Sequence, residues 1–94
     1  MTLGTQNLIS NTTGKNRSFL QRVTKEQEEK YGNSNVFECT IKDQNIVIWF
    51  GDYHLRFFFN DKGEIIDTLG NGQGHKYQNS LKNVAKEIYS KFKI

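Results

Sequence analysis

The sequence predicts a single α+β domain of two layers, with one helix before and one helix after a four-stranded antiparallel meander. Three observations lead to this prediction. Ninety-four residues suffice for one domain. Between residues 36 and 69, short apolar or alternating runs are separated by turn sequences, which is typical of consecutive antiparallel strands. Residues 77–92 repeat apolar side chains with helical spacing, as expected for an amphipathic helix packed on a sheet.

The N-terminal part divides into an arm and a helix. Residues 1–17 are polar and lack periodicity, so we expect a flexible polar arm and place the single α+β domain at residues 18–94. A helix is expected over residues 18–31, and Gly32 should end it in the left-handed conformation. The segment from Thr24 to Gln27 resembles a capping box, so a later start at Thr24 is an alternative.

Four strands are expected at residues 36–42, 46–50, 53–59 and 64–69. The two-residue connection Gly51-Asp52 fixes the pairing of the middle strands. A bulged turn over residues 60–63 should fix the pairing of the last two. The expected partners are Phe50 with Tyr53, Trp49 with His54, Ile48 with Leu55, Val47 with Arg56, Phe59 with Ile65, Phe58 with Ile66, and Arg56 with Thr68.

This register gives the sheet two different faces. The C-terminal helix should cover the apolar one, which carries Ile46, Ile48, Phe50, Tyr53, Leu55, Phe57, Phe59, Ile65 and Leu69. The opposite face is mixed and carries Val47, Trp49, His54, Arg56, Phe58, Ile66 and Thr68. The mixed face is the more informative one for function.

Composition restricts the function classes. The net charge of +3 and pI near 9.1 permit an anionic partner without requiring one. A single cysteine and two histidines without ligand spacing predict no disulfide, no metal and no cofactor. No signal sequence or membrane-length apolar run is present, so we expect a small soluble, cytoplasmic protein without membrane association. Abundant Asn and Lys with no Pro are common in AT-rich genomes, including those of phages and mobile elements.

The run Gly-x-Gly-x-Gly at residues 70–74 precedes the last helix. Backbone amides at such a loop can bind phosphate, which makes Gly72, Gly74, His75 and Lys76 candidate binding residues. Nucleotide-binding motifs, however, need a parallel strand–helix–strand context that an antiparallel meander does not supply. A flexible connector is therefore the first interpretation, and a contact to nucleic-acid phosphates is the alternative.

The mixed face has three interpretations. Trp49, His54, Arg56 and Phe58 could be covered by the N-terminal helix, could form a protein or homodimer interface, or could stack the bases of a single strand. The solvent exposure of Trp49 decides whether this face is a surface.

The leading hypothesis is a small non-enzymatic binding protein that docks the aromatic and basic face onto another protein, as an inhibitor or accessory protein of a phage or mobile element does. The alternative is nucleic-acid binding by the same face and the glycine-rich loop. A second alternative is a metal-independent ribonuclease-like toxin, in which His54, Arg56 and His75 would supply the base, acid and cation.

Overall fold

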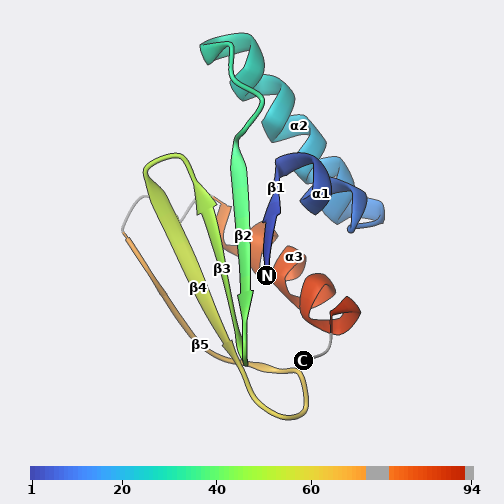
Figure 1. Cartoon of the computed structure of the whole chain (residues 1–94), viewed down its shortest axis with the longest axis vertical. Coiled ribbons are helices and arrows are strands. Elements are labelled where there is room, and N and C mark those ends of the chain that lie inside the picture. The colour runs from blue at the N-terminus through green and yellow to red at the C-terminus, as the bar shows by residue number, and fades with distance from the viewer. Residues whose placement is uncertain (72–76, 93–94) are drawn as a thin grey trace.

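A five-stranded antiparallel sheet forms one layer of the computed structural model, and helices form the other (Figure 1). The structure describes residues 1–71 and 77–92. The strands lie side by side in chain order and are β1 (Thr2–Gly4), β2 (Phe37–Lys42), β3 (Asn45–Phe50), β4 (Tyr53–Phe59) and β5 (Ile65–Gly70). The helices are α1 (Thr5–Ser10), α2 (Gly14–Tyr31) and α3 (Gln78–Lys91). The α+β class is confirmed, but the expected four strands are in fact five.

The additional strand comes from the segment that we expected to be a flexible arm. Its residues form β1, α1 and the beginning of α2. Leu3, Leu8 and Ile9 are buried in the core, although polar neighbours obscure any period in the sequence. The Thr5 hydroxyl then continues the β1–β2 pairing past the end of β1, because it accepts from the Phe37 amide (2.8 Å) and donates to the Phe37 carbonyl (2.9 Å).

Helix α2 begins earlier than expected, at Gly14 rather than Ser18 or Thr24. The Glu87 carboxylate on α3 accepts hydrogen bonds from the Thr13 amide (3.2 Å), the Thr13 hydroxyl (2.7 Å) and the Asn16 side chain (2.8 Å). A side chain distant in sequence therefore caps the helix, which local sequence cannot indicate. The predicted end is confirmed, because Gly32 is left-handed (φ 70°) and its amide donates to the Glu28 carbonyl.

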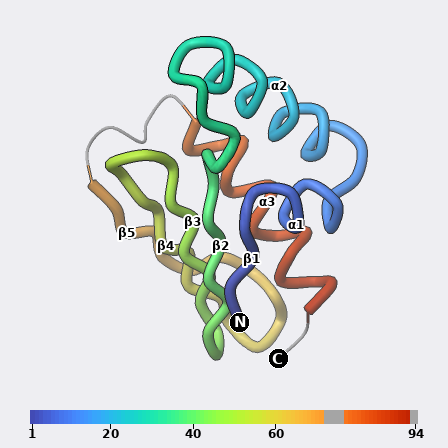
Figure 2. Tube along the Cα trace, turned by 45° about the horizontal axis from the view of Figure 1, so that its top comes forward, coloured from blue at the N-terminus to red at the C-terminus, as the bar shows by residue number. Residues whose placement is uncertain are grey.

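The core lies between the sheet and all three helices, which share one side of it (Figures 1 and 2). Of the apolar series in the sequence of this helix, Leu81, Val84, Ala85 and Ile88 are buried, and Tyr77, Tyr89 and Phe92 are partly buried against the core. At one end of this helix, Tyr89 stacks on Phe59 with ring centroids 4.1 Å apart. The expectation that the C-terminal helix packs on the apolar sheet face is confirmed.

The predicted register holds between β3 and β4 and fails within β5. All four expected β3–β4 pairs form, with Gly51 at φ 59° in the connecting turn. Phe59 also faces Ile65, as expected. Beyond that pair a bulge shifts the strand, so Phe58 faces Asp67 instead of Ile66, and Arg56 faces Leu69 instead of Thr68. The shift moves Leu69, which we had assigned to the core face, next to Arg56, where it is 55% exposed.

Candidate functional site

The sheet face opposite the helices, here called the outer face, is uncovered in the part of the chain that the structure describes. Trp49 on β3 is 42% exposed, and Ile66 in the bulge of β5 is 64% exposed. The N-terminal helix does not cover this face, which corrects our first interpretation of it. Its apolar residues point into the core instead: the Phe19 ring lies 6.4 Å from Phe37 and 5.7 Å from Tyr77.

The pairing of the strands arranges the outer face in three rows. The first row joins Glu38, Trp49 and His54, the second joins Thr40, Val47, Arg56 and Leu69, and the third joins Lys42, Asn45, Phe58 and Asp67. The Trp49 and His54 rings lie 4.5 Å apart at 34°. Val47 is buried among its neighbours although no helix covers it. The centre of the face therefore combines apolar side chains with one guanidinium group.

The charges of the outer face balance. Lys42 and Arg56 are matched by Glu38 and Asp67, whereas the whole chain carries +3. Asp67 reaches this face only because of the bulge, and its carboxylate accepts the Thr68 amide (2.8 Å). The face is consequently less basic than the sequence register had suggested.

Backbone hydrogen bonds to Asn71 fix His54 next to the turn between β3 and β4. Its amide donates to the Asn71 side-chain oxygen (3.2 Å), and the Asn71 amide group donates to the Asp52 carbonyl (3.0 Å). The buried Nδ1 atom of His54 has no hydrogen-bond partner among the described residues. The other half of the proposed catalytic pair, His75, lies outside the described residues, as do Gly72, Gly74 and Lys76.

Gly70 opens the glycine run and is required by close packing. A Cβ atom at this position would lie 2.5 Å from the His54 carbonyl oxygen and 2.6 Å from a Leu55 methyl group. The first glycine therefore lets β5 pass against β4. This reason for a glycine is independent of phosphate binding.

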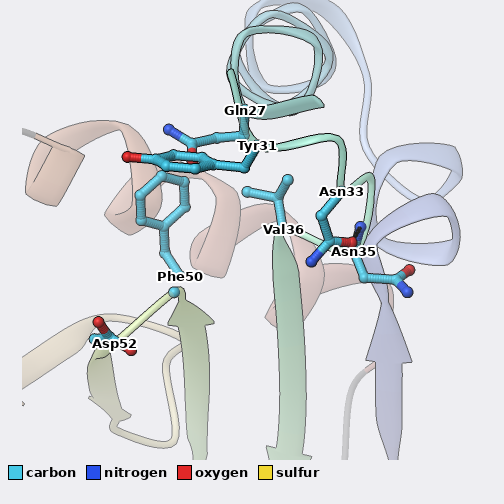
Figure 3. Close-up of a pocket in the computed structure, with 8 residues that line it drawn as sticks. Gln27, Tyr31, Asn33, Asn35, Val36, Phe50 and Asp52 are labelled. Carbon is cyan, nitrogen blue, oxygen red and sulfur yellow. Dashed lines mark hydrogen bonds between the residues drawn. The ribbon is translucent and has the colours of Figure 1, made fainter. Parts of the chain in front are cut away.

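Two shallow hollows adjoin the outer face at the turn between β3 and β4. The first, of about 460 Å³, lies beside Trp49 and is lined by Gly4, Thr5, Asn35, Val36, Phe37, Glu38, Trp49 and Gly51. The second, of about 310 Å³, is lined by Gln27, Tyr31, Asn33, Asn35, Val36, Phe50, Gly51 and Asp52 (Figure 3). Asn33, Asn35 and Val36 come from the loop between α2 and β2, which the sequence analysis did not consider as a site. The available signal was the sequence Tyr-Gly-Asn-Ser-Asn, an aromatic residue followed by side-chain amides in a loop.

Two buried groups titrate outside the usual range. Burial raises the pKa of the Cys39 thiol to about 12. Burial, followed by the nearby Tyr77, raises the pKa of Tyr53 to about 12. Both groups stay protonated at neutral pH, so neither offers a ready nucleophile.

Within residues 1–71 and 77–92, no group of three or more histidine, cysteine or acidic side chains is placed to hold a metal ion. None of the helices in these ranges combines the length and the apolar character needed to cross a membrane. Comparison of the chain with protein-family models, curated proteins and solved structures finds no match.

Proposed function

We propose that this protein is a non-enzymatic binding protein that docks the outer face of its sheet onto another protein. The observation that carries the proposal is the exposure of Trp49, Ile66 and Leu69 on a face that no described helix covers. Large apolar side chains gathered on an open face, with an arginine among them, have the composition of an interface centre. An inhibitor or accessory protein, such as phages and mobile elements encode, would act in this way.

The charge balance of the face favours a protein over a nucleic acid. A polyanionic strand gains its affinity from neutralised phosphates, and the affinity grows with the number of lysines and arginines that contact it. Here Glu38 and Asp67 would face the same strand as Lys42 and Arg56. A protein partner can meet both signs of charge, and this complementarity would set its orientation.

The test compares two face variants with a matched control. Trp49→Ala and Arg56→Ala remove the aromatic and charged anchors, whereas Lys25→Ala changes an exposed residue of α2 on the helix side. The wild-type protein is used as bait in lysate, a captured partner is purified, and its affinity is measured by calorimetry. We expect Trp49→Ala to weaken binding by about 2 kcal/mol, roughly thirtyfold, and Lys25→Ala to leave it unchanged.

Folding and partner class are checked in the same experiment. Trp49 is the only tryptophan, so its emission should be readily quenched by acrylamide in the folded protein. A partner that binds both face variants as tightly as wild type would refute the proposal. So would captured RNA or DNA whose affinity falls steeply with salt. Sedimentation equilibrium shows whether the partner is a second copy of this chain.

A further inference from the structure

The two hollows at the β3–β4 turn adjoin, and we call them together the hairpin-end groove. They share the lining residues Asn35, Val36 and Gly51, with Trp49 at the outer-face end and Tyr31 and Phe50 at the helix-side end. In Figure 3, Val36 lies between the aromatic pair on one side and the two asparagines on the other. The groove thus continues the outer face around the end of the sheet.

The aromatic part of the groove combines a fixed ring with an exposed one. Phe50 contacts Phe37 and Tyr53, both with ring centroids 5.2 Å away, and Tyr77 at 5.4 Å. These contacts hold the ring in place without burying it completely. Tyr31, at the end of α2, is 66% exposed and lies beside Phe50 in the groove (Figure 3). An aliphatic or cationic side chain could lie against such a pair without rearranging the core.

The charge of the groove is opposite to that of the chain. Its charged lining residues are Glu38 in one hollow and Asp52 in the other, and no lysine or arginine is among the described residues that line it. The Tyr31 ring at its edge can contact a cation, as the Lys30 ammonium does at 5.2 Å from the ring centroid, and a partner's cation would have to displace Lys30 there. A positively charged group is therefore the complementary occupant.

The amide side chains that line the groove could bind the backbone of a peptide. The Asn33 side-chain oxygen accepts the Asn35 amide (2.9 Å), which fixes the loop in shape. The side chains of Gln27 and Asn35 have no hydrogen-bond partner within the described part of the chain. An amide group both donates and accepts, so these two side chains could pair with the peptide groups of an extended segment.

The size of the outer face also suggests that a partner extends into the groove. Four strands about 4.8 Å apart and about 20 Å long, with the shorter β1 at the edge, span a sheet area of roughly 400 Å². A standard interface buries about 800 Å² on each partner. A partner docked on the sheet would therefore cover its end as well.

We propose that the hairpin-end groove binds an extended peptide segment of a partner protein that carries a lysine or arginine. The cation would lie in the hollow that Asp52 and the Tyr31 ring share, with Glu38 in the neighbouring hollow adding negative charge. An apolar neighbour would contact Val36 and Phe50, and the asparagine loop would bind the peptide backbone. This inference rests on the proposed function, because the peptide segment would belong to the protein that docks on the outer face. The groove is nevertheless testable without that partner.

The probes are two capped pentapeptides, Ala-Leu-Arg-Leu-Ala and Ala-Leu-Glu-Leu-Ala, titrated into the ¹⁵N-labelled full chain. We expect the arginine peptide to shift the amide signals of Tyr31, Val36 and Gly51. It should bind about tenfold tighter than the glutamate peptide, because one exposed ion pair and one cation–π contact together give about 1.4 kcal/mol. The double variant Glu38→Gln/Asp52→Asn should reduce the preference to about twofold.

The matched control is Asp43→Asn, which removes an acid from the β2–β3 turn at the far end of the sheet. It should keep the tenfold preference. Equal binding of both peptides, shifts confined to other surfaces, or a preference unchanged in the double variant would overturn the inference. Peptide binding that survives in Arg56→Ala while partner binding is lost would show that the groove and the outer face act separately. Peptide binding that fails while partner binding still depends on Trp49 and Arg56 would reject the groove alone.

Discussion

Replacement of Glu87 by alanine should destabilise the protein, although this side chain is only partly buried. This carboxylate accepts three hydrogen bonds, two from Thr13 and one from Asn16. Thr13, which precedes α2, makes no side-chain capping bond to the helix itself. Glu87 therefore both caps α2 and joins it to α3.

The expected loss follows from these bonds. Removing a helix N-cap costs about 1 kcal/mol, and the additional charge-assisted bond to Asn16 contributes about as much when it is partly exposed. Glu87→Ala should thus lower the unfolding free energy by about 2 kcal/mol at pH 7. For a domain of this size, the melting temperature should fall by roughly 10 °C.

The pH dependence gives an independent check. Burial raises the pKa of Glu87, but the hydrogen bonds from Thr13 and Asn16 outweigh it, so the folded pKa lies below the ordinary value of 4.5. A lowered folded pKa means that the stabilisation is complete above the unfolded pKa and is lost as pH falls through the folded one. The difference between wild type and Glu87→Gln should therefore be constant near neutrality and shrink below about pH 4.5.

Urea unfolding followed by circular dichroism at pH 7, 5 and 3 measures both effects. The control is Glu29→Gln, an exposed acid on α2. Glu87→Ala within 0.5 kcal/mol of wild type at pH 7, or a Glu87→Gln difference that persists at pH 3, would contradict the reasoning.

Two further predictions concern packing. Gly70→Ala should destabilise the fold by at least about 2 kcal/mol in thermal unfolding, because its Cβ would collide with the His54 carbonyl oxygen. Gly4→Ala, which has open space around it, should leave the stability nearly unchanged. Equal melting temperatures of the two variants would disprove the clash. The Cys39 thiol should react with a disulfide reagent only as fast as the protein opens, because the folded protein buries its side chain completely. Immediate reaction in native buffer would contradict this burial.

Sequence predicted the parts of the fold that depend on neighbouring residues. The two-residue turn at Gly51 set the β3–β4 pairing, and the period of α3 identified its buried side. Because that register was correct, Trp49, His54, Arg56 and Phe58 could be assigned to one face from the sequence alone.

The errors arose where distant residues decide the outcome. Strand β1 is held by pairing with β2, which the bonds of the Thr5 hydroxyl to Phe37 extend, and α2 begins where Glu87 of α3 reaches Thr13. The bulge at Ile66 of β5 is a local feature, but the sequence of the turn did not reveal the extra residue. The hairpin-end groove was missed for a similar reason, since a loop and a turn form it only when α2 packs beside the sheet.

The order of the strands has a consequence for the folding pathway. Strands β2 to β5 follow one another in the chain, so each pairs with its neighbour across a short turn. The β1–β2 pair joins Thr2 to Thr40, with α1 and α2 in between. Closing this larger loop is slower, so we expect the meander to form before β1 docks. Until then the outer edge of β2, with Phe37 and Ile41 on its core side, stays open to pairing with other chains. The docking of β1 covers this edge, so the rate at which β1 docks sets how long the folding chain is exposed to aggregation.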